Sequence, residues 1–178
     1  MFEPDTSTRY GTVSRIAHGV GALAVLAMLG IGIYFHEMPK GDERSYWLGL
    51  HVGLGVLFFL PLIFRVGWGV FSKSPREIEM SRAEQLLAAT VQRLLLFAIA
   101  VMLVVGVLIP WSGGHSIEVF GLFALPSPIA EHEGFHDLLE TVHGVGGRAI
   151  LVLVIIHVIG VVKQAIKNFE SLKGRMFL

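Results

Sequence analysis

The chain of 178 residues contains eight histidines and no cysteine. The lack of cysteine excludes disulfides, iron–sulfur clusters, thiol catalysis and covalent c-type haem attachment. Four histidines lie inside long apolar segments, where an ionisable side chain is costly and indicates a function: His18, His51, His143 and His157. Because neutral imidazole is a good ligand of iron, the spacing of these four residues is the main clue to the chemistry of the chain.

The spacing of the four histidines places them at two depths. His143 and His157 are 14 residues apart, about 21 Å of helix, and 14 steps of 100° come within about 40° of four full turns, so both share one helix face. His18 lies near the start of the first segment and matches the depth of His157, near the end of the fourth. His51 lies near the start of the second, antiparallel segment and matches the depth of His143. The sequence therefore predicts two histidine pairs stacked across a helical bundle, where haem sites are commonly built.

Two axial histidines leave a haem iron without an open coordination position. Such a centre passes electrons and does not bind oxygen or catalyse hydrolysis. Two of these centres, one near each face of a membrane, would form an electron relay across it.

Glycines follow three of these histidines within four residues: Gly19 and Gly21 after His18, Gly53 and Gly55 after His51, and Gly144, Gly146 and Gly147 after His143. A glycine beside a ligand leaves room for a flat macrocycle against the backbone, at a cost in helix propensity. Small residues also serve helix packing in membranes. The glycines therefore favour haem only in combination with the paired histidines.

Another histidine, His36, competes for a ligand position. It lies 18 residues after His18, on the same helix face and near the opposite end of the segment. It would replace His51 as a ligand in an alternative arrangement. We favour His51, because His36 opens a polar segment and has no glycine neighbours.

Residues 132–136 spell H-E-x-x-H, the zinc-peptidase signature. A hydrolase needs a third ligand and a substrate cleft, for which a chain of this size offers no further fold, and Gly134 weakens a helix there. We interpret the match as chance or as a solvated acidic face. A non-catalytic surface metal site at His132 and His136, with His115 as a third ligand, is the alternative.

Four apolar segments must position the histidines. Hydrophobic residues make up 53% of the chain and charged residues 16%, against about a quarter charged in soluble domains, and the mean hydropathy is +0.68. A membrane span needs about 20 apolar residues, and the segments that qualify are about 16–35, 46–71, 86–110 and 141–166. Residues 1–178 are therefore predicted to form a single all-α integral membrane domain, a four-helix bundle. Zero net charge with few basic residues excludes nucleic acid as a partner.

The basic residues predict the orientation of the bundle. Eleven of the 14 lie in the two tails, in the connection between the second and third spans, or at the adjoining span edges. The positive-inside rule then places both termini in the cytoplasm. The opposite, outer loops hold eight acidic residues against two basic ones, a balance of −6.

Arg148 is the one arginine well inside a span, five residues after His143 and about 7.5 Å deeper. A guanidinium at that depth needs a partner. A haem propionate is one alternative, and a lipid phosphate or a backbone carbonyl is the other. Arg15, Arg65 and Arg93 could also bind inner propionates, but we favour a role as topology anchors for them.

The placed histidines resemble the pattern of the bacterial cytochrome b561 family of di-haem membrane proteins. Residues 6–11, TSTRYG, and residues 119–123, VFGLF, followed by Pro126 are similar local marks, and the resemblance covers nearly the whole chain. It implies two b haems, with His18 and His157 on the inner iron and His51 and His143 on the outer iron. Family members exchange electrons with the quinone pool, and some are superoxide:quinone oxidoreductases. Others are thought to serve a periplasmic, lipocalin-like isoprenoid-binding protein.

The expected function is that of an oxidoreductase or electron carrier surrounded by membrane lipid, linking a periplasmic partner or substrate to membrane quinone. The acidic outer loops suit a basic or isoprenoid-binding periplasmic protein better than superoxide, because an anionic substrate gains from a positive surface. The alternative is a non-redox membrane protein that binds or transports metal through the outer histidines. A surface-metal hydrolase is a third and weaker hypothesis.

Overall fold

The computed structural model describes residues 3–72, 75 and 80–176, except for the side chains of residues 168 and 170–176. Within these residues, four helices and two strands follow in order: α1 (Thr12–His36), α2 (Asp42–Phe71), α3 (Arg82–Ser112), β1 (Ile117–Val119), β2 (Phe123–Leu125) and α4 (Glu133–Met176). Lys73 and Arg76, two of the basic residues that predict the orientation, lie outside the described residues. The side chains of Lys173 and Arg175 lie outside them too.

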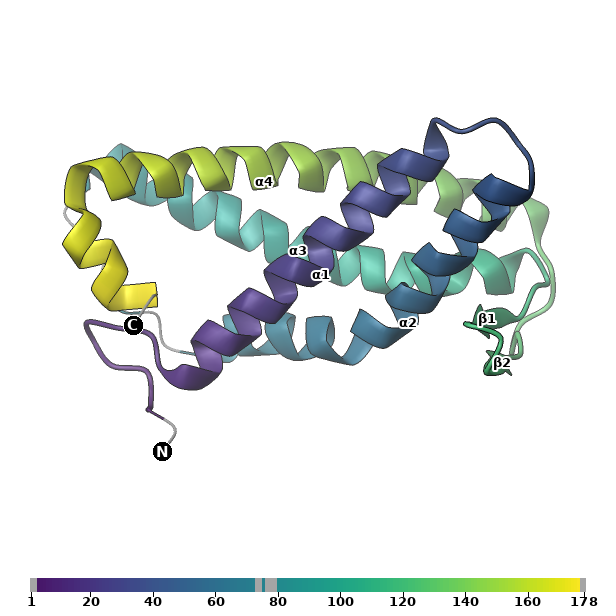
Figure 1. Cartoon of the computed structure of the whole chain (residues 1–178), viewed down its shortest axis with the longest axis horizontal. Helices are drawn as coiled ribbons and strands as arrows, with labels where there is room; N and C mark the ends of the chain where they lie inside the picture. Colours follow the sequence, from purple (N-terminus) through teal and green to yellow (C-terminus); the bar gives the residue numbers. More distant parts are fainter. Residues whose placement is uncertain (1–2, 73–74, 76–79, 177–178) are drawn as a thin grey trace.

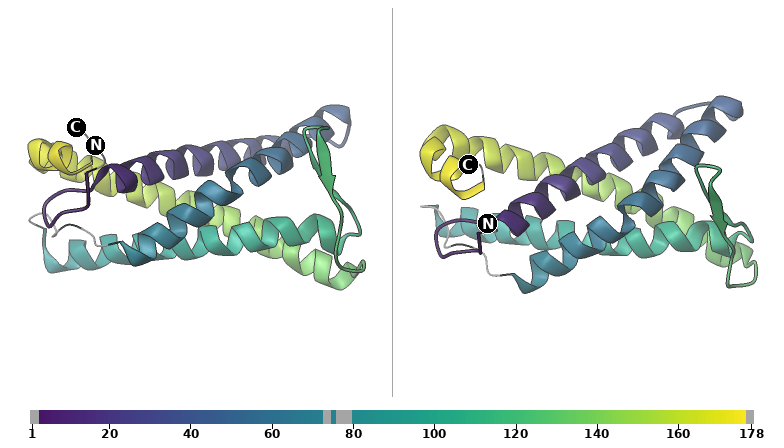
Figure 2. Two further views of the ribbon diagram at one scale, coloured as in Figure 1. Left: turned by 90° about the horizontal axis from the view of Figure 1, so that it is seen from below. Right: turned by 60° about the horizontal axis from the view of Figure 1, so that its bottom comes forward.

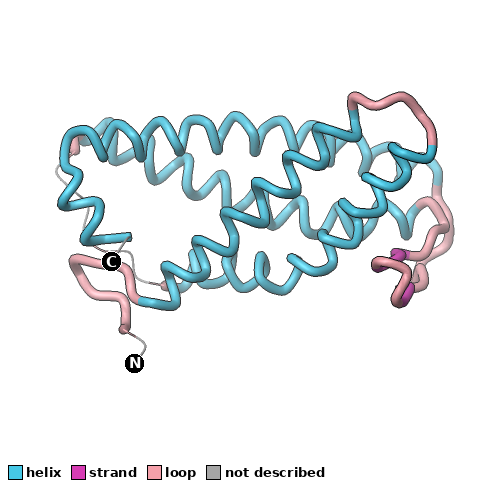
Figure 3. The backbone as a smooth tube through the Cα atoms, in the orientation of Figure 1, coloured by secondary structure: helices cyan, strands magenta, loops and turns pink. Residues whose placement is uncertain are grey.

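The helices run nearly the full length of the molecule, and the loops are confined to its two ends (Figure 3). Both chain termini lie at one end, which we call the terminal end (Figure 1). The α1–α2 connection and the two strands lie at the opposite end, which we call the hairpin end. The helices cross one another at an angle, as two further views show (Figure 2).

All four helices are long and apolar enough to cross a membrane. Each predicted span falls inside one helix, so the prediction of a four-helix membrane bundle is confirmed. Helix α3 begins where the sequence offers a capping box: the Ser81 side chain accepts from the Glu84 backbone N–H, and the Glu84 carboxylate accepts from the Ser81 backbone N–H. Helix α4 begins eight residues before its predicted span, because residues 133–140 continue the helix beyond the apolar stretch.

The two strands were not predicted from the sequence. β1 and β2 pair antiparallel, with Val119 opposite Phe123, in the long connection between the third and fourth predicted spans. The turn between them places Phe120 and Gly121 at positive φ angles of 52° and 70°. The Phe120 ring lies over Gly53 of α2, where a Cβ atom would be 2.6 Å from the ring. The hairpin is thus fitted to the side of α2 at a position that only glycine leaves open.

The packing leaves two helix pairs. α1 packs against α2 and α3 against α4, while α2 also contacts α3 and α1 meets α4 only narrowly. Over the described residues, α2 and α4 do not pack against each other. Large apolar side chains cover the outside, for example Leu60 at 72% exposure and Ile166 at 81%, as expected where lipid replaces water. Among the described residues, the largest side chain that is completely buried is only that of Ser112.

Candidate metal centres

The first histidine pair lies toward the terminal end. His18 projects from α1 and His157 from α4, with ring centres 6.3 Å apart and ring planes at 47°. These helices meet only narrowly, so the two rings face each other across a region that helix packing does not fill. The pair is one of the two predicted from depth along the spans.

The second pair lies toward the hairpin end. His51 of α2 and His143 of α4 have ring centres 6.2 Å apart and ring planes at 79°. The Nδ1 atoms of both rings are buried and have no hydrogen-bond partner within the described part of the chain. Buried polar atoms are normally paired, so two orphaned nitrogens at one place indicate a missing ligand.

The geometry of both pairs fits a metal ion between the rings. A histidine nitrogen lies about 2 Å from a bound metal ion and roughly 1 Å from the centre of its own ring, so two rings on opposite sides of one ion have centres about 6 Å apart. The observed separations are 6.2 and 6.3 Å. The bundle also completely buries none of its large apolar side chains among the described residues, which leaves its interior suited to a large apolar group such as haem.

Glycines of two other helices adjoin the hairpin-end pair. A Cβ atom at Gly32 of α1 would lie 3.3 Å from His51 Cε1, and one at Gly106 of α3 would lie 3.6 Å from His143 Cε1. Each imidazole edge therefore rests against a helix that does not carry it. Neither glycine was identified from the sequence, because neither neighbours a histidine along the chain.

The glycines next to the histidines mostly have another role than the one predicted. The backbone at Gly21 receives the Arg65 side chain, that at Gly53 receives Phe120, and that at Gly146 receives Met102. At these three positions the glycine accommodates a side chain of another helix or of the hairpin, so its place beside a histidine does not by itself indicate room for a macrocycle. At Gly19 and Gly147, a Cβ atom would have nothing within 4 Å, so the space beside these two glycines is open.

Arg65 lies beside the terminal-end pair, although its place near a span edge had favoured a topology anchor. Its guanidinium interacts electrostatically with both His18 and His157. Its Cγ atom lies 2.9 Å from the Cβ position of Gly21, and its Nη1 atom 2.6 Å from that of Gly69. A sequence signal did exist: Arg65 follows His51 by 14 residues, the interval that separates His143 from His157.

Arg148, unlike Arg65, does not lie between helices beside a histidine pair. It is exposed, and its Nη1 atom lies back along its own helix, 3.7 Å from the Cβ position of Gly144. Its role as a propionate partner remains a prediction. His36, the competing ligand, is exposed at the last residue of α1, whereas His51 is paired with His143.

The two histidines of the H-E-x-x-H segment have structural partners. His132 Nδ1 accepts a hydrogen bond of 3.1 Å from the Phe135 backbone N–H and so caps the start of α4. His136 Nδ1 lies 2.9 Å from the Ile109 backbone oxygen, and its Nε2 lies 3.5 Å from Glu140 Oε1. The described residues include no group of three or more His, Asp or Glu side chains placed to hold a metal ion. The geometry thus favours the structural interpretation of this segment over a surface metal site at His132, His136 and His115.

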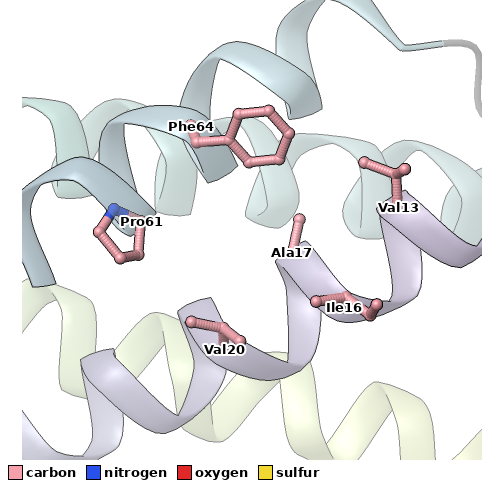
Figure 4. Close-up of a pocket in the computed structure, with 6 residues that line it drawn as sticks. All are labelled: Val13, Ile16, Ala17, Val20, Pro61 and Phe64. Atoms are coloured by element: carbon pink, nitrogen blue, oxygen red, sulfur yellow. The ribbon is translucent and has the colours of Figure 1, made fainter.

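An apolar groove of about 250 Å³ lies between α1 and α2 (Figure 4). Its lining residues are Val13, Ile16, Ala17, Val20, Pro61 and Phe64. A second cavity of about 350 Å³ shares Val13 with the groove and is bordered by the carboxylate residues Glu3 and Asp5 and by Trp68. Val13 thus borders both an apolar groove and a cavity with polar lining residues.

A short hydrogen-bond chain connects residues that line the second cavity. Trp68 Nε1 donates to Ser14 Oγ at 2.7 Å, and Ser14 Oγ donates to Asp5 Oδ2 at 2.8 Å. The Asp5 carboxylate also accepts from the Gly11 backbone N–H at 2.6 Å. These bonds fix the N-terminal segment over the start of α1 and hold a protonatable group beside the groove.

Comparison with known proteins gives two results. The family described as prokaryotic cytochrome b561 matches residues 9–177. Cytochrome b561 homolog 2 of Escherichia coli (strain K12) is 30% identical over 158 residues, which cover 86% of this chain and 82% of that protein. The family match spans both histidine pairs and Arg65.

Proposed function

Because this chain belongs to the prokaryotic cytochrome b561 family, whose members carry electrons across a membrane through haem b, we propose that it does so through two b haems in series. His18 and His157 ligate the first, and His51 and His143 ligate the second. The observation that carries the proposal is the pair of ring separations, 6.3 and 6.2 Å, at two depths of one bundle. A protein with a single haem would need only one such histidine pair.

The residues of the chain supply positions and surroundings for this reaction. Haem supplies one-electron oxidation and reduction when it is bound. His143 and His157 lie about 21 Å apart along α4, so haems held by the two pairs would lie at two depths. A haem held by two imidazoles would have no coordination position left for oxygen. All four histidines are half-buried, and Gly32 and Gly106 lie against the second pair.

We orient the bundle with its terminal end in the cytoplasm and its hairpin end in the periplasm of a bacterial inner membrane. The support is charge. Described basic residues near the terminal end include Arg9, Arg15, Arg82, Lys163 and Lys167. The eight acidic residues at the hairpin end, in its loop segments, in β1 and in the first turns of α2 and α4, are all exposed: Glu37, Asp42, Glu43, Glu118, Glu131, Glu133, Asp137 and Glu140. Positive residues are retained on the cytoplasmic side of bacterial membranes.

We place the quinone site in the groove between α1 and α2. Ile16 and Phe64, which are 55% and 50% exposed, open it to lipid, where an isoprenoid tail can enter. Ala17, next to His18 in the chain, lies on its floor, and Asp5 supplies a protonatable group in the second cavity. Replacing Ala17 with leucine fills the groove, so we expect reduction of the haems by a quinol to slow about tenfold while dithionite still reduces them fully. The matched control is Leu23→Phe, on an exposed face of the same helix.

For the donor at the hairpin end, the acidic surface favours a basic or isoprenoid-binding periplasmic protein over superoxide. One of the two basic residues in these loops, Arg44, donates to the Phe35 backbone oxygen at 3.2 Å and is thus engaged. Attraction between opposite charges is screened by salt, so electron transfer from a basic donor should slow as ionic strength rises. A rate independent of salt would contradict a charged protein donor. Rapid reduction of the haems by superoxide would instead favour superoxide as the substrate.

Haem analysis of the purified protein tests the proposed function. We expect two b haems per chain by pyridine haemochrome assay, and one after either His18→Ala or His51→Ala. The reduced-minus-oxidised spectrum lost in His157→Ala should match that lost in His18→Ala, and His143→Ala should match His51→Ala. One haem or none in the unmodified protein would overturn the proposal and favour a membrane metal-binding or transport protein.

A further inference from the structure

Each histidine pair lies at one depth of the bundle, which we call a layer. The two layers differ in which helix, besides α4, carries the histidine. On α4, the positions 14 residues apart are both histidine, His143 and His157. On α1, the same interval separates His18 from Gly32, and on α2 it separates Arg65 from His51. The partner of the α4 histidine therefore comes from α1 in the terminal-end layer and from α2 in the hairpin-end layer. The corresponding position of the other helix is Arg65 on α2 in the terminal-end layer and Gly32 on α1 in the hairpin-end layer.

Contacts confirm that these positions belong to the layers. Gly32 adjoins the His51 ring at the hairpin end. The Arg65 side chain lies against Gly21 of α1, three residues and about one helix turn after His18. Its positive charge therefore lies near the terminal-end pair, 14 residues along α2 from His51.

The surroundings of Arg65 keep its charge effective. No carboxylate of the described residues forms an ion pair with it, since the described ion pairs involve Glu3, Glu84 and Glu140. Its guanidinium lies over Gly69, next to the Leu96 side chain of α3, which is 2.9 Å from the same Cβ position. Charges interact more strongly in such apolar surroundings than in water. The two glycines, Gly21 and Gly69, give the long side chain a fixed path toward the histidines.

We infer that Arg65 is a positioning residue that sets the redox order of the two centres, making the terminal-end haem the better electron acceptor. The inference rests on the proposed function, because it requires a haem at each pair. Reduction lowers the charge of the iron by one, so a fixed cation nearby stabilises the reduced form and raises its potential. The hairpin-end centre lies about 21 Å farther along the helix and feels much less of this charge.

The resulting electron movement is balanced without any other reactant. One electron leaves the reduced hairpin-end iron and reduces the oxidised terminal-end iron, and no bond forms or breaks. The same direction holds if a haem propionate binds Arg65, because neutralising that negative charge also favours the reduced iron. Arg65 thereby directs electrons from the hairpin end toward the groove between α1 and α2.

Potentiometric titration of the purified, haem-loaded protein tests this inference. In Arg65→Gln we expect the midpoint of the terminal-end haem to fall by at least about 59 mV, a tenfold change in its one-electron equilibrium, while the hairpin-end midpoint stays constant. Arg65→Lys should retain most of the original value, because it keeps the charge. The control is Arg93→Gln, which removes an exposed arginine of α3 and should shift neither midpoint.

A second variant covers the case in which Arg65→Gln fails to bind haem. A Cβ atom at Gly69 would be 2.6 Å from Arg65 Nη1, so Gly69→Ala displaces the charge without removing it. We expect a smaller fall of the same midpoint, with Gly67→Ala, which has open space at its Cβ, as control. Two bound haems with unchanged or equally shifted midpoints in the Arg65 and Gly69 variants would overturn the inference alone, whereas fewer than two haems in the unmodified protein would overturn the proposed function.

Discussion

The two ends of the bundle carry the same pair of histidines in different surroundings. The ring separations differ by only 0.1 Å. Near the hairpin end, the rings rest against Gly32 and Gly106. Near the terminal end, Arg65 lies against Gly21, about one helix turn after His18, and an apolar groove is lined by Ala17, the residue before His18. The comparison teaches that residues around the ligands, more than the ligands, distinguish two centres of one kind.

This contrast suggests a division of labour. The hairpin-end centre is enclosed by glycine contacts and faces acidic loops, which suits receipt of an electron from outside. The terminal-end centre has a cation and a lipid-facing groove, which suits delivery of an electron to a quinone. Three substitutions outside the ligands, taken from the largest expected effect to the smallest, can break or sharpen this contrast.

The largest effect is expected at Gly32. Its Cβ position is already 3.3 Å from the His51 ring, so Gly32→Leu must push the imidazole out of its place, and we expect loss of the hairpin-end haem alone. The haem content should fall from two per chain to one by pyridine haemochrome assay. Gly30→Leu, on the same helix with open space at its Cβ, should retain both haems; loss of both haems in Gly32→Leu would remove the contrast between the ends.

An intermediate effect is expected at Gly53, where the hairpin lies on α2. Gly53→Ala places a methyl group 2.6 Å from the Phe120 ring, and overpacking of this kind costs about 1–3 kcal/mol. We expect the hairpin-end haem to be lost at a lower temperature, measured by its absorbance during heating. Adding Phe120→Ala to this variant should restore the temperature at which half of the haem is lost, because it removes the clash. If it does not, the hairpin does not protect this centre.

The smallest effect is expected at Glu84. This residue pairs with Lys163 at 2.7 Å and Lys167 at 3.5 Å, which joins α3 to α4 at the terminal end. Both lysine side chains are more than half exposed, and exposed ion pairs contribute little to stability. Glu84→Gln should leave both midpoint potentials unchanged in a redox titration. A shift of the terminal-end midpoint would mean that surface charge, rather than Arg65, sets its potential.

Much of this arrangement could be predicted from the sequence, because it depends on one helix at a time. Helical periodicity and span length were enough to pair His18 with His157 and His51 with His143. Gly32 and Gly106 could not be found in this way, since each contacts a histidine of another helix. Arg65 was misjudged because a cation near a span edge usually marks topology, although its distance from His51 carried the signal. The hairpin was missed because three-residue strands in a long loop leave little periodicity to detect.

The central claim, that two centres act in series across the membrane, is tested most directly in proteoliposomes that contain trapped ferricyanide. With the charged reductant dithionite added outside, bleaching of the trapped oxidant reports electrons that the protein has carried across the bilayer, because dithionite crosses lipid only slowly. We predict that the unmodified protein bleaches it, and that His18→Ala and His51→Ala each stop the transfer although each retains one haem. Transfer at an undiminished rate in either variant would contradict the account, because it would show that one centre suffices.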